Sequence, residues 1–380
     1  MEISLIYNLN QKDVLLNSGF KPEMLYFLRG TEIPDEEWER IDKTKLTEFP
    51  GIIDILKEIG KTKSIIDPVV DDYVSRIEHK ELRELVEYVT KSPSWRERPL
   101  IIRLAANALG YEYADSLVHV SAGIELFEES AILLDDVLDE ATMCVGKETT
   151  WIKYGIKDTF IAHGLLTSLA RSALLEGCRK AGLTTQKSEE VMNAFEEIYY
   201  SDYVGQYVDM SSERNIDFSE NDYFKMISRT PGTQFANALV ILSIFTNRED
   251  VKENLREFGR NFGMAAQLRD DIIDIIGNEK VVYKKLFTDI LRKKKKLPLI
   301  LFLQRLPEYR NLFNDDIPIN EKQLSEIISR IHDYGIIDMC ISRVKNLTNS
   351  AIKSLKVINE NYGKNLLVQL ANLLGSFNGT

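Results

Sequence analysis

The stretch "LLDDVLDEA", residues 133–141, places three aspartates inside an apolar, helix-forming run. In an α-helix, Asp135 and Asp139 lie one turn apart on the same face, about 6 Å from each other, and Asp136 is turned by about 100°. Like charges this close destabilise a helix unless a cation lies between them, and Mg²⁺ prefers carboxylate oxygens. For a single cluster of this kind, a solvated acidic helix face is the alternative interpretation.

A second stretch, "QLRDDIIDIIG" at residues 267–277, repeats the spacing with Asp270, Asp271 and Asp274. The residues around these aspartates are isoleucines, and those around the first three are leucine and valine, which indicates that both helices are largely buried. An unpaired buried carboxylate shifts its pKa or destabilises the fold. The two copies therefore predict a site in which divalent metal ions bridge two facing sets of aspartates, called below the first and the second triplet.

The composition excludes several classes of protein. The 380 residues carry 48 Lys and Arg against 59 Asp and Glu, a net charge of −11, which argues against a nucleic-acid binder. Cys144, Cys178 and Cys340 are widely spaced and indicate free thiols in a reducing compartment. The first residues lack the build of a signal peptide, and the longest apolar run, "FANALVILSIF", is about half of a membrane span. We expect a cytoplasmic protein that does not span a membrane.

Helical periodicity dominates the chain, and alternating strand patterns are almost absent, so the predicted fold class is all-α. We expect a helical N-terminal extension of unknown role over residues 1–82 and a catalytic domain over 83–380. The basic run "RKKKK" at 292–296 is by default a solvated loop or helix end. The expected helices lie near residues 82–92, 98–109, 113–141, 158–180, 188–211, 220–246, 250–276, 289–305, 321–334 and 338–374.

From about residue 88 to its C-terminus, the chain resembles the trans-isoprenyl diphosphate synthases of the polyprenyl synthetase family, which carry two DDxxD motifs on facing helices. The resemblance implies an isoprenoid synthase type bundle of about ten or more antiparallel helices around a deep central cavity, usually assembled as a homodimer. Besides the triplets, it rests on "RERPLIIRLAANALG" (96–110), "GKETTWIKYG" (146–155), "GQYVD" (205–209), "YFKMISRT" (223–230), Gln267, Lys284 and "DILRKKKKLPL" (289–299).

The resemblance also implies roles for individual residues. Three Mg²⁺ ions, with Mn²⁺ as a possible substitute, would be held by the two triplets, grip an allylic prenyl diphosphate and neutralise the charge that develops as the C–O bond breaks. Arg229 could instead be an ordinary surface arginine, and Lys293, Lys295 and Lys296 are expected to be solvated. The residues expected to bind the substrate diphosphate are Arg96, Arg98, Arg229, Gln267, Lys284 and Lys294.

The chain departs from the family in the pocket for isopentenyl diphosphate. In "PSWRERP", Trp95 stands where the family has a lysine, and Glu128 stands where it has a histidine. Cys144 and Val145 replace an arginine pair, and Trp151 replaces a further histidine. These changes remove roughly four charge-assisted contacts to phosphate, each worth about 1.5 to 3 kcal/mol. The sequence therefore predicts that isopentenyl diphosphate binds poorly.

Retained triplets and a lost acceptor pocket favour an enzyme that resembles a terpene synthase, in which the prenyl cation cyclises or rearranges after diphosphate is released. Trp95 and Trp151 are candidates to face that cation, and packing at a helix junction is the alternative for both. Ser130 and Ala131 are small, and we expect them to leave room for a substrate of C20 or longer below the first triplet.

Two other functions stay open. The chain could be a chain-elongating prenyl diphosphate synthase, or a prenyltransferase to a non-isoprenoid acceptor, which product analysis with and without acceptor would distinguish. It could also be a non-catalytic subunit of a heteromeric synthase, which would bind no Mg²⁺ in the presence of diphosphate.

Overall fold

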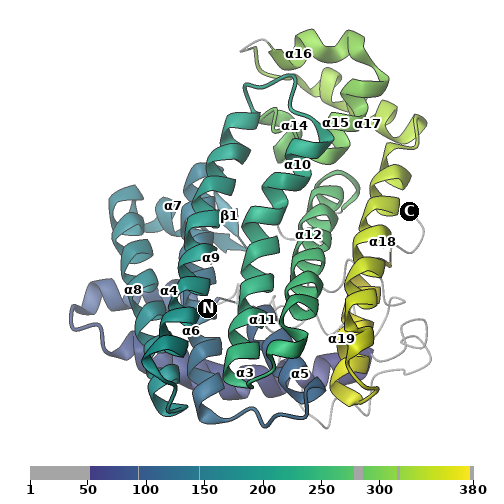
Figure 1. Ribbon diagram of the computed structural model, residues 1–380. Coiled ribbons are helices and arrows are strands. Elements are labelled where there is room, and N and C mark those ends of the chain that lie inside the picture. The colour runs from purple at the N-terminus through teal and green to yellow at the C-terminus, as the bar shows by residue number, and fades with distance from the viewer. Residues whose placement is uncertain (1–51, 93, 145, 278–285, 315–316, 377–380) are drawn as a thin grey trace. The chain divides into compact units, whose positions relative to one another are not determined.

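The structure is a computed structural model that describes residues 52–92, 94–144, 146–277, 286–314 and 317–376 (Figure 1). The chain divides into two compact units. Of the described residues, those within 52–188 and 359–376 form the first unit, and those within 189–277 and 286–358 form the second. Each unit is described by itself.

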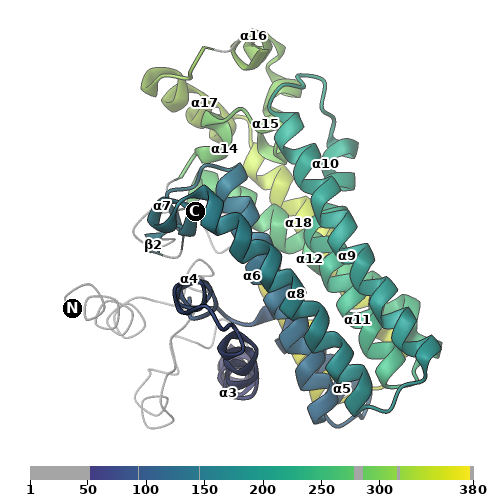
Figure 2. The ribbon, with the colours of Figure 1, turned by 90° about the vertical axis from the view of Figure 1, so that its left-hand side faces the viewer.

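The first unit is helical apart from one short hairpin, in which Met143 pairs with Glu148 and Cys144 with Lys147. Helices α6 and α8 pack along one another and lie side by side in Figure 2. Gly177 allows this close approach, because a Cβ there would lie 2.8 Å from the carbonyl oxygen of Ser116. The elements are α3 (Ile52–Ser75), α4 (Lys80–Thr90), α5 (Glu97–Ala108), α6 (Asp115–Leu138), β1 (Met143–Cys144), β2 (Lys147–Glu148), α7 (Thr150–Tyr154), α8 (Ile156–Lys180) and α19 (Tyr362–Leu374).

Helix α3 is the described part of the predicted N-terminal extension, and it packs against α4, α5 and α6. Tyr73 of α3 is fully buried, and its hydroxyl lies 2.8 Å from Nδ1 of His119 on α6. Arg103 of α5 forms an ion pair with Glu58 of α3. Residues 52–82 are thus an integral part of the first unit, whereas residues 1–51 lie outside the described residues.

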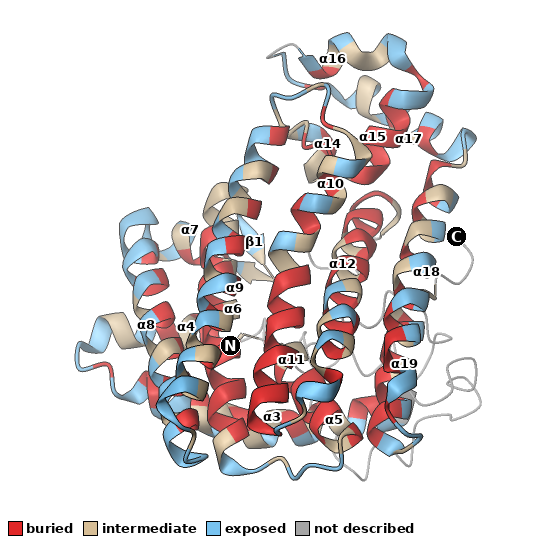
Figure 3. Ribbon diagram, in the orientation of Figure 1, coloured by how far each residue is buried: buried red, intermediate tan, exposed pale blue. Residues whose placement is uncertain are grey.

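The second unit has α12 at its centre, packed against α11 and α18. Every residue of α11 is buried, as Figure 3 shows along the length of this helix, because its sequence is apolar on all sides. The elements are α9 (Thr185–Ser212, which begins in the first unit), α10 (Glu220–Ile227), η3 (Ser228–Gly232), α11 (Thr233–Phe245), η4 (Glu249–Val251), α12 (Lys252–Ile276), α14 (Thr288–Leu291), α15 (Leu297–Arg305), η5 (Pro307–Tyr309), α16 (Arg310–Asn314), α17 (Glu321–Asp333), α18 (Ile336–Ser354) and η6 (Leu355–Val357).

Most predicted helices are confirmed to within a few residues, but three continuous ones were wrong. The helix predicted over 220–246 is interrupted by the π-helical turn η3, which contains Pro231. The one predicted over 289–305 divides into α14 and α15 at the basic run, and the one over 338–374 divides into α18, η6 and α19. A proline inside a helix removes a backbone hydrogen bond, which accounts for the first interruption.

The predicted all-α class is confirmed, since the hairpin of β1 and β2 is the only strand pair within the described residues. Among these residues, no helix combines the length and the apolar character that crossing a bilayer requires.

Candidate active site

The first triplet lies in the last turn of α6, where Asp139 is the C-cap residue. All three aspartates are half-buried. Burial, together with the charges of Asp135 and Asp139, raises the pKa of Asp136 to about 8. The carboxylate of Asp136 has no hydrogen bond or ion pair within the part of the chain that the structure describes.

The position of the first triplet adds to its negative charge, because the C-terminal end of a helix carries partial negative charge of its own. Lys147 attracts Asp136 electrostatically, but its Nζ donates to the backbone oxygen of Tyr88 and lies 3.9 Å from the centre of the Tyr88 ring. A divalent cation would supply the missing positive charge, so hard carboxylate oxygens in this setting fit Mg²⁺.

The loop after the first triplet is held by one backbone oxygen. The carbonyl oxygen of Ala141 accepts hydrogen bonds from Oγ1 of Thr149 at 2.6 Å and from Nε1 of Trp151 at 2.7 Å. The indole N–H of Trp151 therefore binds this loop, and the predicted contact of its ring with a prenyl cation stays a prediction.

The second triplet lies near the C-terminal end of α12 and is more deeply buried. Asp271 is 4% exposed and Asp274 is 2% exposed, whereas Asp270 is half-buried. Asp271 accepts hydrogen bonds from Oη of Tyr223 at 2.5 Å and from Nε2 of Gln267 at 3.0 Å. Burial raises the pKa of Asp271 to about 6 against the opposing effect of a nearby lysine, Lys296.

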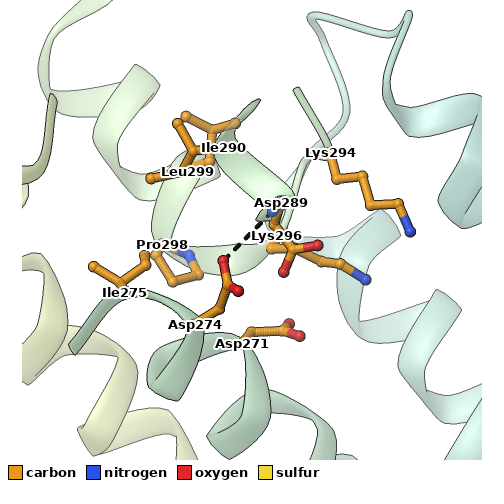
Figure 4. Close-up of a pocket in the computed structure, with 9 residues that line it drawn as sticks. All are labelled: Asp271, Asp274, Ile275, Asp289, Ile290, Lys294, Lys296, Pro298 and Leu299. Carbon is orange, nitrogen blue, oxygen red and sulfur yellow. Dashed lines mark hydrogen bonds between the residues drawn. The ribbon is translucent and has the colours of Figure 1, made fainter. Parts of the chain in front are cut away.

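Asp274 is held by the segment that begins α14. Its carboxylate accepts from Oγ1 of Thr288 at 3.2 Å and from the backbone N–H of Asp289 at 3.4 Å. Figure 4 shows Asp271 and Asp274 directed toward Asp289 and Lys296 across a small pocket. The pocket measures about 10 Å³, roughly the room that one water molecule needs. Its lining residues are Asp271, Asp274, Ile275, Asp289, Ile290, Lys294, Lys296, Pro298 and Leu299.

Two lysines of the basic run meet at Asp209 on α9. Nζ of Lys294 lies 2.6 Å from Oδ2 of Asp209, and Nζ of Lys296 lies 2.7 Å from Oδ1. Lys294 is almost completely buried in this ion pair. Its predicted contact with a substrate diphosphate stays a prediction.

The expectation that Lys295 and Lys296 are solvated was wrong. Lys295 is 1% exposed, and its Nζ donates to the backbone oxygens of Ser212 and Glu213 at 3.1 and 2.9 Å. These oxygens end α9, where a cation is favourable because the last carbonyls of a helix have no partners within it. Lys293, in contrast, is half-buried and donates to the backbone oxygen of Ile317.

Three other residues predicted to bind diphosphate, Gln267, Arg229 and Lys284, are not in comparable positions. Gln267 is half-buried and bound to Asp271. Arg229 is exposed on η3, which passes so close to α9 that a Cβ on Gly205 would lie 2.3 Å from Cγ2 of Thr230. Lys284 lies outside the described residues.

Arg96, in the first unit, is buried and surrounded by carboxylates. Its guanidinium contacts Asp67 at 2.7 Å, Glu125 at 3.0 Å and Glu129 at 2.8 Å, and it also donates to the backbone oxygen of Thr90 at 2.7 Å. Burial raises the pKa of Glu129 to about 8. Arg96 thus binds protein groups in this structure, and its predicted contact with a diphosphate stays a prediction.

Arg98 is neutralised by the residue that replaces the family's histidine. Its Nη1 lies 2.9 Å from Oε1 of Glu128, and both side chains are largely buried. Trp95 is buried as well, and its Nε1 has no hydrogen-bond partner within the described residues. Cys144 is half-buried in β1, while Val145 lies outside the described residues.

Ser130 and Ala131, expected below the first triplet, are both buried. The hydroxyl of Ser130 lies 2.8 Å from Nδ1 of His163 and 2.8 Å from Oγ1 of Thr167, both on α8. Ser130 therefore points into the contact of α6 with α8, and its role in substrate length stays a prediction. The role of Ala131 in substrate length stays a prediction.

Neither triplet encloses a metal ion by itself, since no three His, Cys, Asp or Glu side chains in the described ranges are arranged to hold one ion. That Asp135 and Asp270 face each other across a cavity, about 8 to 14 Å apart, stays a prediction.

Sequence reasoning missed four residues around the second triplet: Asp209, Tyr223, Asp289 and Lys296. All four lie in stretches that carry the family resemblance, but no spacing relates them to the aspartates of α12. The nearest of them to the triplet in sequence, Asp289, follows Asp274 by 15 positions. Only the fold brings them together.

The chain is similar to known proteins of one family. A family profile described as polyprenyl synthetase matches residues 79–334. The chain is 27% identical over 327 residues to a geranylgeranyl pyrophosphate synthase of Geoglobus acetivorans, a match that covers 85% of this chain and 98% of that protein. It is 30% identical over 247 residues to a geranylgeranyl diphosphate synthase of Sulfolobus acidocaldarius, covering 64% of this chain and 73% of that protein.

Solved structures have the same fold. A geranylgeranyl pyrophosphate synthetase from Pyrococcus horikoshii matches with a TM-score of 0.76 at 23% identity, over 85% of this chain and 98% of that one. A polyprenyl synthase from Caulobacter crescentus matches with a TM-score of 0.74 at 20% identity, over 85% and 98% of the two chains. The chain has the all-α isoprenoid synthase fold and belongs to the polyprenyl synthetase family.

Proposed function

We propose that the chain is an Mg²⁺-dependent enzyme that breaks the C–O bond of an allylic prenyl diphosphate. The observation that carries the proposal is the pair of aspartate triplets, each at the C-terminal end of a buried helix, where negative charge is least favourable without a cation. When bound, Mg²⁺ would stabilise the negative charge of the leaving diphosphate.

The residues around the triplets have distinct roles in this proposal. In the first triplet, Asp136 offers a carboxylate without a hydrogen bond or ion pair from any described residue, while Tyr223 and Gln267 fix Asp271 in one orientation. Preorganised charged groups act strongly because they do not reorient during the reaction. The apolar residues that bury both helices would limit the access of water to the prenyl cation.

Transfer of the prenyl group to isopentenyl diphosphate, which lengthens the chain, is the first candidate for the fate of that cation. Relatives named for the synthesis of geranylgeranyl and geranylfarnesyl diphosphate support it. We expect a substrate or product of C20 or longer, because Ala131 is small at its position in α6.

Cyclisation or rearrangement without an acceptor, as in a terpene synthase, is the second candidate, and one observation favours it. The ion pair of Arg98 with Glu128 removes the charge of an arginine that would otherwise be available to a second diphosphate. A carboxylate at this place also repels an anion directly.

One experiment tests the proposal and separates the two candidates. The full-length protein is incubated with Mg²⁺ and geranyl, farnesyl, geranylgeranyl or geranylfarnesyl diphosphate, with and without labelled isopentenyl diphosphate. Released diphosphate and extracted products are then measured. Incorporated label supports elongation, a hydrocarbon or alcohol without label supports cyclisation, and absence of diphosphate release with every substrate contradicts the proposal.

A variant examines the acceptor region directly. Glu128→Gln removes the carboxylate that pairs with Arg98, and we expect incorporation of labelled isopentenyl diphosphate to rise by about tenfold, the effect of one charge-assisted contact. Glu112→Gln, at an exposed position, is the matched control and should change nothing. Unchanged incorporation in a folded Glu128→Gln variant would show that this ion pair does not limit acceptor binding.

A further inference from the structure

Lys296 is a lysine buried at the second triplet. Its Nζ binds Asp209 at 2.7 Å, and the side chain is 12% exposed. It also lines the small pocket together with Asp271, Asp274 and Asp289 (Figure 4). A cation that is paired with one carboxylate and shares a pocket with three others is thus part of the second unit itself.

Asp209 forms ion pairs with two lysines at once. Lys294 already lies 2.6 Å from the other oxygen of Asp209 and is almost completely buried there. The two lysines together carry one positive charge more than Asp209 carries negative charge. Lys296 is attracted most strongly to Asp209 and, beyond it, to Asp271 and Asp289, with which it lines the pocket.

Two carboxylates of the second triplet also accept hydrogen bonds from the protein. Asp271 binds Tyr223 and Gln267, and Asp274 binds Thr288 and the backbone N–H of Asp289. A metal ion at this place would have to compete with these donors and with a fixed positive charge. At the first triplet, Asp136 has no such partner within the described residues.

We infer that Lys296 acts as a built-in counter-cation of the second triplet and takes over part of the charge neutralisation that a metal ion would supply there. The second triplet then binds a divalent ion weakly in the free protein, and metal loading begins at the first triplet. This inference rests on the proposed function, since it concerns the same metal-dependent site. Lys296 is a positioning residue in this scheme, because it acts through Asp271 and not on the substrate.

A titration of the full-length protein with Mn²⁺, in the absence of diphosphate, tests this inference. Electron paramagnetic resonance measures the free ion at each step. Lys296→Met removes the charge and keeps the length of the side chain. We expect it to create an additional Mn²⁺ site or to tighten the second one by about tenfold. Adding Asp274→Asn to Lys296→Met should abolish the gain, which assigns it to the second triplet.

Two further variants keep the test decisive. Lys293→Met, in the same basic run but bound to the backbone oxygen of Ile317, is the matched control and should bind Mn²⁺ as the unchanged protein does. Lys296→Arg keeps the positive charge and should also bind Mn²⁺ as the unchanged protein does. Equal Mn²⁺ binding by a folded Lys296→Met variant would overturn the inference, as would the same gain in Lys296→Arg.

The outcome is separable from that of the proposed function, because Mn²⁺ binding is measured without turnover. If Lys296→Met gains metal while no prenyl diphosphate is cleaved, the inference stands and the proposed reaction fails. If a prenyl diphosphate is cleaved and metal binding does not depend on Lys296, the proposed reaction stands and the inference about Lys296 fails.

Discussion

The first triplet, at the end of α6, and the second triplet, near the end of α12, place the same DDxxD spacing in different surroundings. Around the first, the protein leaves the carboxylate of Asp136 without a hydrogen bond or ion pair from any described residue. Around the second, Tyr223, Gln267, Thr288 and Lys296 supply donors and charge. The spacing of a motif therefore defines which side chains share a helix face. Residues distant in sequence determine how much positive charge a bound cation still has to supply to these side chains.

The largest expected effect concerns turnover. Asp136→Asn removes a carboxylate that no described residue binds and that a cation would stabilise, and we expect kcat/KM to fall by about 10³-fold. Asp271→Asn should cost about 10²-fold, because Lys296 and Gln267 remain beside it. Steady-state kinetics with geranylgeranyl diphosphate measure both, and circular dichroism checks that the variants are folded. Equal losses would mean that the two surroundings do not affect how the triplets work.

The hydrogen bond of Tyr223 to Asp271 should matter for stability. Tyr223→Phe deprives a buried carboxylate of a donor, and we expect the free energy of unfolding to fall by about 2 kcal/mol. Urea denaturation followed by circular dichroism measures the change. Tyr200→Phe, at an exposed position on α9, is the control and should leave the unfolding midpoint unchanged. A fully stable Tyr223→Phe variant would show that Asp271 does not depend on its donors.

A smaller effect should appear in the pH dependence of the metal-free protein. The pKa of Asp136 is about 8 in the folded protein, against an ordinary value of 3.8. Between these values the folded state keeps a proton that the unfolded state releases, so Asp136 destabilises the fold progressively as pH rises from about 4 to 8. Allowing for its partial exposure, we expect Asp136→Asn to raise the melting temperature at pH 8 by about 2 to 4 °C and to change it little at pH 4.

This comparison is made in EDTA by differential scanning calorimetry, and Mg²⁺ should remove much of the difference, because the ion stabilises the ionised triplet. Asp139 has the same side chain in the same turn, so Asp139→Asn provides a second variant that relieves Asp136 of a neighbouring charge. A melting temperature of Asp136→Asn equal to that of the unchanged protein at pH 8 would contradict the raised pKa.

Sequence alone was sufficient for those features that are local. Helical periodicity predicted α6 and α12 closely, and the repeated spacing identified all six aspartates, because one turn of helix fixes the relation of i to i+4. The interruption at Pro231 carried a local signal that could have been used. The burial of Lys296 carried none, since a run of four lysines is usually solvated and its partner Asp209 lies 87 positions earlier.

The surroundings of Arg96 and Arg98, in the region expected to bind isopentenyl diphosphate, were also not predictable from the local sequence. Arg96 and Arg98 keep the family's pattern in sequence, yet carboxylates 29 to 33 positions away bind Arg96, and Glu128 binds Arg98. Glu128 could be identified as a departure, but that it neutralises Arg98 depends on how α5 and α6 pack. A family motif thus predicts the identity of a side chain more safely than its freedom to bind a ligand.

The π-helical turn at Ser228–Gly232 determines which side chains of the following helix, α11, point in which direction. Such a turn holds one residue more than an α-helical turn, so everything in α11 is rotated by about 100° relative to an uninterrupted helix. Deleting one residue, for example Thr230, would restore regular helical geometry locally and yet turn Gln234 away from Asp202 and Asn237 away from Glu197. The insertion or deletion of one residue at this position therefore rotates a buried helix about its axis. The resulting loss of stability comes from the polar contacts that α11 makes after the turn.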